Sequence, residues 1–307
     1  MKLKNKALAV LLTIALVGIL GGCGSKTNNT SDSNTTTPTQ EATDTATDTP
    51  AATDTPSTEN LSGTVTITGS TSVDKILNDM IDEFTANNPD VTINYTGTGS
   101  SAGIADSISG ANDIGASSRD LKDDEKTAGL KETVFAYDGI AIAVNPANPV
   151  TDISTENLAK IFSGQITNWK DVGGNDAKIV VVSREGASGT RSAFEELVKL
   201  EDAGGLTEDA TVAEGNGNVQ TAVAGNENAI GYVSFSFIDN TVKSLTVNGV
   251  EGTPENAKSG EYVLSRPFLF VYNDAKASAA AKAFVEFSLS DDGQAFVEKH
   301  GGIKLDK

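Results

Sequence analysis

VTITGSTSVDKILNDMIDEF, the sequence from Val65 to Phe84, contains the structural unit that recurs along this chain. Its first four residues are β-branched and predict a short strand, which ends at Gly69-Ser70-Thr71. The apolar residues that follow recur at intervals of three and four, the spacing of one face of a helix. They are Val73, Ile76, Leu77, Met80, Ile81 and Phe84. A strand that leads through a glycine turn into a helix is typical of α/β proteins.

Units of the same kind continue toward the C-terminus. A strand at Val91–Tyr95 is expected to turn at Gly97–Ser101 into a helix with Ile104 and Ile108 on one face. Further strands are expected at 113–117, 140–144, 179–183, 229–234 and 268–272, and further helices at 156–162, after Thr190 and at 275–289. Because strands alternate with helices, we expect an α/β fold with mainly parallel sheets and a ligand at the carboxyl ends of the strands.

Small hydroxyl residues and glycine occupy three of the turns that lead into helices: Gly69-Ser70-Thr71, Gly99-Ser100-Ser101 and Ser188-Gly189-Thr190. The start of a helix exposes unpaired N–H groups and the positive end of the macrodipole, and a hydroxyl adds a further donor. For any one turn, a plain helix cap is an equal explanation. Three such turns, with arginines beside two of them, are better explained by convergence on one anion. Arg184 is suited to a bidentate contact with an oxyanion, the alternative being a surface or interdomain salt bridge.

The N-terminus has the pattern of a secretory signal. Three lysines precede an apolar run at 7–20, which is shorter than the about 20 residues that a membrane span needs. The run ends at Gly21-Gly22, directly before Cys23, the only cysteine of the chain, so no internal disulfide can form. A lone cysteine at this place resembles the lipobox of bacterial lipoproteins. The resemblance implies a signal peptide at 1–22 and a lipid on Cys23; the alternative is a cysteine within a cleaved signal.

The next segment, 23–60, has almost no residues that build a core. It consists mostly of Thr, Ser, Asp, Asn, Ala and Pro, with ATDT repeated approximately from Ala42, Ala46 and Ala52. Such a segment buries too little apolar surface to offset the entropy lost on folding. We therefore expect a disordered tether, followed by a folded body that begins near Leu61.

The expected folded body, 61–307, is strongly acidic. The chain has a net charge of −19, and loss of the three signal lysines leaves 20 basic residues (23 less three) against 42 acidic ones. This balance argues against nucleic acid and against a basic membrane-binding surface. An anion must then be attracted by local groups, which screening by salt over about 8–10 Å permits. A body of this length accommodates one large domain or two smaller ones.

The sequence contains little that would support catalysis. A Ser-His-Asp mechanism needs a histidine base, and the only histidine, His300, is distant in sequence from the serine-rich turns. The segment Gly186-Ala187-Ser188-Gly189 does not match the G-x-S-x-G turn of α/β-hydrolases. The sequence has no histidine-rich or cysteine-rich metal pattern either. We therefore expect that the protein is not an enzyme and that it binds no metal and no cofactor.

Six segments of the body carry a resemblance to a known family. They are TGSTSV from Thr68, YTGTGSSAGI from Tyr95, DIGASSR from Asp113, LAKIFSGQITNW from Leu158, SREGASGTR from Ser183 and NAIGYVSFSFI from Asn228. Together they resemble the substrate-binding lipoprotein of the bacterial high-affinity phosphate ABC transporter, Pst type, over essentially all of 61–307. The combination of IFSGQITNW with SGTR at this spacing is specific, and no fragment is decisive alone.

The resemblance implies a type II periplasmic-binding-protein-like fold, a clamp of two α/β lobes joined by two hinge strands. Lobe I would comprise 61–139 and 264–307, and lobe II would comprise 140–263. The phosphate-binding residues that the family motifs imply in lobe I are Ser70, Thr71 and Ser100. Those implied in lobe II, which would close on the anion from the opposite side, are Arg184, Ser188, Gly189 and Thr190.

One position departs from the family. Some members have an aspartate after the third strand that accepts the proton of monohydrogen phosphate, and this sequence has Ser118 there, followed by Arg119. Both residues are included among the expected phosphate contacts. Asp138, at the entrance to the hinge strand, is the candidate for the missing proton acceptor. The alternative for Asp138 is a turn or hinge residue.

The resemblance also implies partners and a location. The protein would deliver inorganic phosphate to transmembrane permease subunits that work with a cytoplasmic ATPase. We expect a monomer, lipid-anchored on the extracytoplasmic face of the cell membrane, with no nucleic-acid partner. The alternatives are a binding protein for another tetrahedral oxyanion, such as sulfate, molybdate or tungstate, and a cell-surface phosphate sensor without transport.

Overall fold

The structure, a computed structural model, describes residues 60–306. The expected signal peptide, Cys23 and nearly all of the expected tether lie outside the described residues, as does Lys307. None of the helices among residues 60–306 is both long enough and apolar enough to cross a membrane.

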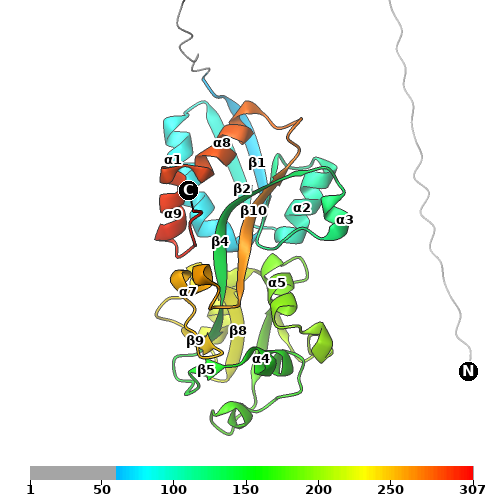
Figure 1. Cartoon of the computed structure of the whole chain (residues 1–307), viewed down its shortest axis with the longest axis vertical. Helices are drawn as coiled ribbons and strands as arrows, with labels where there is room; N and C mark the ends of the chain where they lie inside the picture. The colour runs from blue at the N-terminus through cyan, green and yellow to red at the C-terminus, as the bar shows by residue number, and fades with distance from the viewer. Residues whose placement is uncertain (1–59, 307) are drawn as a thin grey trace, which may run out of the picture. The chain divides into compact units, whose positions relative to one another are not determined.

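Strands and helices alternate along most of this part of the chain (Figure 1). The strands are β1 (Gly63–Gly69), β2 (Val91–Thr96), β3 (Ile114–Ser117), β4 (Lys131–Val144), β5 (Asp152–Ile153), β6 (Val180–Arg184), β7 (Thr211–Ala213), β8 (Ala229–Ser234), β9 (Lys243–Val247) and β10 (Ser265–Tyr272). The α-helices are α1 (Asp74–Asn87), α2 (Ser100–Ser109), α3 (Asp123–Lys126), α4 (Thr155–Phe162), α5 (Gly189–Leu197), α6 (Gly215–Ala224), α7 (Pro254–Ser259), α8 (Ala279–Leu289) and α9 (Asp291–Lys299). Short 3-10 helices include η1 (Thr71–Val73) and η4 (Phe235–Phe237). The predicted α/β class is confirmed.

One path of hydrogen-bonded strands runs through the described chain in the order β2-β1-β3-β10-β4-β8-β6-β7. β1 is parallel to β2 and β3, and β6 is parallel to β7 and β8. Each antiparallel pair among these named strands includes β4 or β10. The sheets are therefore mixed. The expected parallel pairing is found among the strands other than β4 and β10, the two long strands that connect the halves of the path.

Strand β4 takes part in both halves of this path. Its residues 131–139 pair with β10, and its residues 140–144 pair with β8 and β9. We refer to the part with β1, β2 and β3 as lobe I and to the part with β5 to β9 as lobe II; Figure 1 shows them above and below, with β4 and β10 between. The Ile140 N–H donates to the Leu264 carbonyl at 2.7 Å. The chain thus crosses between the lobes at two neighbouring strands.

Each lobe is built on its own hydrophobic core. In lobe I, the rings of Phe135 and Phe270 stack with their centroids 4.3 Å apart, within a cluster contributed by strands and by α1 and α8. In lobe II, the rings of Phe194 and Tyr232 stack at 4.2 Å, in a cluster that also contains the buried Trp169. Because the cores are separate, each lobe can move as one body about the connecting strands.

The C-terminal end reaches across this division. Although 264–307 was expected to belong to lobe I, Ile303 packs in the core of lobe II. Its backbone exchanges two hydrogen bonds with Tyr137, at 2.9 and 2.8 Å, beside the crossing in β4. Lys258 in α7 also pairs with Asp306. The end of the chain therefore contacts both lobes.

The ends of the last helices follow from two serine caps. The helix expected at 275–289 begins at Ala279, because the Ser278 hydroxyl accepts the Ala281 N–H at 3.1 Å. Ser290 follows it and caps α9, accepting the Gly293 N–H at 3.2 Å. Helix α9 was not predicted, and neither were α6, α7 and the first half of β4.

Candidate functional site

The end of β1 places the first hydroxyl-rich turn at the carboxyl edge of lobe I's sheet. Gly69 has a φ of 144°, and a Cβ there would lie 2.0 Å from the Ala116 carbonyl oxygen in β3, so this position requires glycine. The Ser70 hydroxyl accepts the Ser72 N–H at 3.1 Å and caps η1. Ser70, Thr71 and Ser72 therefore follow the strand directly, in a tight turn.

Three buried serines of lobe I meet at this edge and form what we call the serine cluster: Ser70, Ser100 and Ser118. Ser70 Oγ donates to Ser118 Oγ at 2.8 Å, and Ser100 Oγ lies 3.2 Å from the same atom. Ser100 Oγ also accepts the Ser118 N–H at 3.0 Å. The residues come from the ends of β1 and β3 and the start of α2, which parallel neighbours bring to one edge.

The third hydroxyl-rich turn approaches the serine cluster from lobe II. Ser188 caps α5, since its Oγ accepts the Arg191 N–H at 3.1 Å. A Cβ on Gly189 would lie 2.2 Å from the Ser100 hydroxyl oxygen and 2.8 Å from the Ser118 hydroxyl oxygen. The backbone of lobe II therefore comes into close contact with the hydroxyls of lobe I. The three turns singled out in the sequence converge in space.

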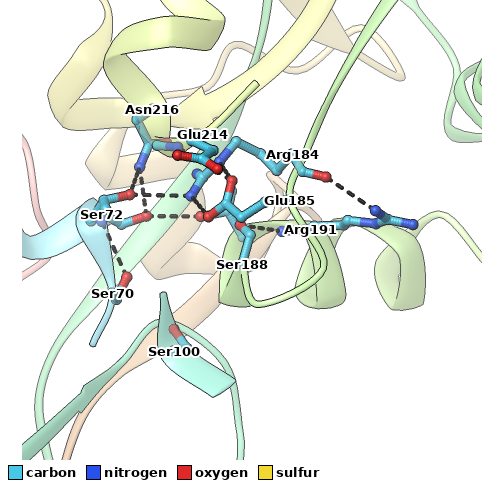
Figure 2. Close-up of polar contacts among 12 residues, drawn as sticks. Ser70, Ser72, Ser100, Arg184, Glu185, Ser188, Arg191, Glu214 and Asn216 are labelled. Carbon is cyan, nitrogen blue, oxygen red and sulfur yellow. Dashed lines mark hydrogen bonds and ion pairs between the residues drawn. The ribbon is translucent and has the colours of Figure 1, made fainter. Parts of the chain in front are cut away.

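Further side-chain contacts join the lobes at this place. Ser72 Oγ and Thr190 Oγ1 lie 2.8 Å apart, and Arg184 Nη2 donates to Thr71 Oγ1 at 3.2 Å. Asn216 Nδ2 donates to Thr71 Oγ1 at 3.2 Å and to Ser72 Oγ at 3.1 Å. Figure 2 shows Asn216 and Arg184 of lobe II directed at the turn that carries Ser72. The site is thus shared between the two lobes.

Arg184 is buried at this contact, with a side chain that is 1% exposed. Its Nε and Nη2 donate to the Glu185 carboxylate at 2.8 and 2.7 Å. This salt bridge joins adjacent residues within lobe II, so it is not the surface or interdomain salt bridge that was the alternative from the sequence. Burial opposes ionisation of Glu185, but the hydrogen bonds from Arg184 prevail and hold the pKa of Glu185 below its ordinary value. Arg184 Nη1 is buried and has no hydrogen-bond partner among the described residues. Such a donor calls for an acceptor, because leaving it unpaired costs about 1–3 kcal/mol.

A second buried arginine, Arg266, reaches the site from β10. Its Nη2 lies 2.9 Å from Asp138 Oδ2 and 3.0 Å from Ser72 Oγ, and its Nη1 donates to the Ser118 carbonyl at 3.1 Å. Asp138 Oδ1 accepts from Ser234 Oγ at 2.9 Å. Burial raises the pKa of Asp138, and the nearby Arg266 guanidinium opposes that rise. Asp138 is therefore connected to the hydroxyls of the site through Arg266.

Arg119 lies next to Ser118 in sequence, but its guanidinium has other partners. Nη1 and Nη2 each lie 2.7 Å from the Glu125 carboxylate, and Nη2 also donates to Ser101 Oγ at 3.1 Å. These hydrogen bonds hold the pKa of Glu125 below its ordinary value. The structure does not join the Arg119 guanidinium to the serine cluster by any hydrogen bond within residues 60–306.

Three residues of the contact were not predicted from the sequence: Ser72, Asn216 and Arg266. Ser72 stands one position after the turn that was considered, so its place in the TGSTSV segment was a usable signal. Asn216 lies in the unpredicted helix α6, and Arg266 precedes an apolar run that indicates only a strand. Their participation depends on which strands become neighbours.

Groups that can donate hydrogen bonds dominate the site. Hydroxyl, amide and guanidinium groups come together with the N-terminal ends of α2 and α5, whose dipoles favour negative charge. Two of the nearby carboxylates, Glu185 and Asp138, are each paired with an arginine. Residues 60–306 contain no group of three or more His, Cys, Asp or Glu side chains placed to hold a metal ion. The arrangement suits a small anion with several acceptor oxygens.

Comparison with protein families and with curated proteins identifies relatives of this chain. A family model described as the PBP superfamily domain matches residues 35–292. The chain is 36% identical over 246 residues to the phosphate-binding protein PstS of Borreliella burgdorferi, which covers 76% of this chain and 88% of that protein. It is 37% identical over 220 residues to the phosphate-binding protein PstS of Bacillus subtilis, covering 69% and 71%.

Comparison with solved structures finds relatives of the same kind. A phosphate ABC transporter substrate-binding protein from Clostridium perfringens, with bound phosphate, is 47% identical with a TM-score of 0.77, covering 80% of this chain and 100% of that chain. An ABC-type phosphate transport receptor from Vibrio cholerae is 37% identical with a TM-score of 0.68, covering 78% and 100%.

Proposed function

We propose, because this chain belongs to the PBP superfamily and to its family of PstS-type phosphate-binding proteins, that it captures inorganic phosphate and delivers it to an ABC-type importer. The observation that carries the proposal is the buried Nη1 of Arg184, which has no acceptor among the described residues. The Nη2 atom of the same guanidinium donates to the Thr71 hydroxyl of lobe I at 3.2 Å, at the contact where the Ser72 and Thr190 hydroxyls of the two lobes meet. A phosphate oxygen supplies the acceptor, and the guanidinium geometry matches phosphate well.

The proposed contacts are divided between the lobes. Lobe I contributes hydroxyl and backbone donors from the turns after β1 and β3 and from the start of α2, namely Ser70, Thr71, Ser100 and Ser118. Lobe II contributes Arg184, Ser188, Gly189 and Thr190. Because each lobe provides part of the hydrogen bonding, binding draws the lobes together about β4 and β10. The hinge is proposed to lie near 139/140 and 263/264, where the chain crosses.

Transport requires partners and a place at the membrane. We propose that the protein acts as a monomer on the extracytoplasmic face, held by a lipid on Cys23 and by the segment 23–60. Its closed, phosphate-loaded form would dock on transmembrane permease subunits that work with a cytoplasmic ATPase. The lone cysteine after the apolar run and the membership of a transport family support this arrangement.

Catalysis is not part of the proposal. Solved relatives are described as a substrate-binding protein and a receptor for phosphate transport, and the chain's only histidine is paired away from the serine cluster. His300 Nε2 lies 2.8 Å from Asp79, a residue of α1. A histidine base for a serine nucleophile is therefore not supplied at the serine cluster by the described residues.

Selectivity for phosphate over sulfate requires an acceptor for the phosphate proton, and Asp138 is the proposed acceptor. Donors already reach both of its oxygen atoms: Arg266 on Oδ2, and Ser234 on Oδ1. A carboxylate offers about four acceptor positions, and Arg266 uses a second one on Oδ2 through its Nε at 3.3 Å. To accept the phosphate proton, Asp138 must therefore share an oxygen atom with one of these donors.

The direct test is a calorimetric titration of the mature protein with phosphate, sulfate and molybdate. Phosphate should bind more tightly than the other two anions, which carry no proton for an acceptor. Tighter binding of sulfate or molybdate would reassign the protein to another oxyanion. If the protein binds none of the three anions, the proposed function is wrong.

A further inference from the structure

The backbone of β8 holds the Asn216 side chain in one orientation. Asn216 lies in the first turn of α6, in lobe II, and is 1% exposed. Its Oδ1 accepts the Ser234 N–H at 3.0 Å. A backbone N–H can only donate, so the amide oxygen must face Ser234 and the amide nitrogen must face the other way. Figure 2 shows that nitrogen directed at the lobe I turn with Ser72.

The Asn216 amide and two arginines fill the acceptor positions of two hydroxyls. A hydroxyl has one proton and two lone pairs, whereas amide and guanidinium N–H groups only donate. Thr71 Oγ1 accepts from Asn216 Nδ2 and from Arg184 Nη2, each at 3.2 Å. Ser72 Oγ accepts from Asn216 Nδ2 at 3.1 Å and from Arg266 Nη2 at 3.0 Å. Both hydroxyls can therefore make further hydrogen bonds only as donors.

This count also determines the direction of the hydrogen bond between the lobes. Ser72 Oγ and Thr190 Oγ1 are 2.8 Å apart, and distance alone leaves the donor undecided. Since both lone pairs of Ser72 are taken, Ser72 must donate and Thr190 must accept. Thr190 then keeps its own proton for another acceptor, and Thr71 keeps its proton as well. One hydroxyl donor from each lobe remains available at the contact.

We infer, resting on the proposed capture of phosphate, that Asn216 is a positioning residue for selectivity: it makes Thr71 and Thr190 donors toward the anion. A protonated phosphate oxygen is then disfavoured on this side of the site, because its proton would face only donors. The phosphate proton must point elsewhere, and a second proton on phosphate is disfavoured. Affinity should accordingly fall as the pH is lowered and the phosphate dianion becomes the monoanion.

Asn216→Asp tests this inference with nearly unchanged shape. One oxygen of the new carboxylate can still accept the Ser234 N–H. The other oxygen replaces the Asn216 amide nitrogen, so it accepts a hydrogen bond from a hydroxyl where the amide donated one. Either Thr71 turns its proton away from the anion, or Ser72 turns its proton away from Thr190, which must then donate to Ser72 instead of to the anion. A negative charge is also added. In titrations with inorganic phosphate, we expect the dissociation constant to rise about a hundredfold at alkaline pH. The deficit should shrink as the pH is lowered, because a proton on the new carboxyl group restores a donor.

Two further variants separate this effect from charge and packing. Asn218→Asp adds the same charge to the same helix at an exposed position, and we expect a change of no more than about twofold. Asn216→Ala removes the amide without adding charge and frees one acceptor position on Thr71 and one on Ser72. We expect about a tenfold loss of affinity at alkaline pH, and a smaller loss as the pH is lowered, because the variant site can accept a phosphate proton. Thermal unfolding of each variant establishes that the protein used in the titration is folded.

The results of these titrations distinguish failure of the positioning role of Asn216 from failure of the proposed phosphate-binding function. A deficit in Asn216→Asp that is the same at every pH, or no larger than that of Asn218→Asp, overturns the positioning role. Parent-like binding by Asn216→Ala overturns it too. If the unmutated protein does not bind phosphate, the proposed function fails and the inference fails with it.

Discussion

Arg266 and Asp138 are register partners on the antiparallel strands β10 and β4, and their side chains form an ion pair of 2.9 Å. The two side chains are 2% and 1% exposed, so neither charge is compensated by bulk water. Arg266 also bonds to Ser72, and Asp138 bonds to Ser234 in lobe II. The pair therefore lies where the hinge strands, the binding hydroxyls and the opposite lobe meet.

Asp138→Asn should destabilise the protein, because it leaves the buried Arg266 charge without its counterion. Breaking a buried ion pair in this way costs about 3–5 kcal/mol in the free energy of unfolding. Chemical denaturation measures the loss. Asp274→Asn is the matched control: Asp274 pairs with Lys131 at 3.4 Å at the other end of the same two strands, where both side chains are about half exposed.

The same variant tests the proposed proton acceptor. If Asp138 accepts the phosphate proton, Asp138→Asn lowers the ratio of phosphate affinity to sulfate affinity, measured by titration with both anions. A ratio equal to that of the parent protein would limit Asp138 to neutralising Arg266. Ser118, which stands where some relatives carry an aspartate, would then be the next residue to test.

Arg184→Ala should weaken phosphate and sulfate alike, because a guanidinium pairs with negative charge and does not recognise the ligand's proton. We expect a loss of about 2–5 kcal/mol in binding free energy for either anion, part of it from the Glu185 carboxylate left unpaired. Arg191→Ala is the comparison, since the Arg191 side chain is 26% exposed and pairs with Glu195 on the same helix. Arg191 Nη1 also donates to the Arg184 carbonyl at 3.1 Å, so we expect a loss of affinity that is smaller than that of Arg184→Ala. Loss of affinity for only one anion would contradict a purely electrostatic role.

Gly189→Ala should hold the lobes apart. The added Cβ would lie 2.2 Å from Ser100 Oγ across the interlobe contact, closer than atoms can approach without movement. Overpacking of this kind costs about 1–3 kcal/mol, which would weaken phosphate binding about tenfold to a hundredfold. Gly186→Ala adds the same methyl group in the same loop with no atom within 4 Å, and it should bind as the parent does. Equal affinities for the two variants would argue against close contact of the lobes in the bound state.

Phosphate should reduce the radius of gyration of the folded body, because donors from two separately folded lobes are proposed to close on one ligand. Contacts such as Ser101 N–H to the Ala187 carbonyl at 3.1 Å, and Lys75 Nζ to the Ser236 carbonyl at 2.6 Å, join the lobes on either side of the site. Solution scattering with and without phosphate measures the change. A profile that does not change at saturation would indicate a rigid, preformed site.

Cys23→Ala should release the protein from the membrane and leave its phosphate affinity intact. The reason is that the lone cysteine follows the apolar run of the signal and precedes a polar segment, well before the body that carries the proposed site. Membrane fractionation together with titration of the released protein measures both properties. Retention of the variant at the membrane would show that another part of the chain, or a partner, anchors it.

Local sequence determined the elements and their ends. The β-branched run before Gly69 became β1, and the predicted strand at 229–234 is β8 residue for residue. Two of the three hydroxyl-rich turns form side-chain caps, at Ser70 and Ser188, because a serine cap is decided by interactions within a few residues. The N-cap of α2 is Gly99, which has no side chain to cap the helix. The parallel pairs followed from the alternation of strands with helices, since a crossover helix leaves the next strand parallel.

Tertiary structure alone decided which distant residues share the site. Arg266 and Asp138 meet because β10 and β4 pair in one register, and nothing local in either strand encodes that register. Asn216 reaches Thr71 and Ser72 only because α6 of lobe II is brought against the first turn of lobe I. Arg119, adjacent to the serine cluster in sequence, is instead directed to Glu125. Short-range interactions select helices, strands and caps, and they also give Arg184 and Arg119 carboxylate partners that are close in sequence. The pairing of Arg266 with Asp138 instead depends on the packing of strands far apart in the chain, where desolvation makes the pairing strong.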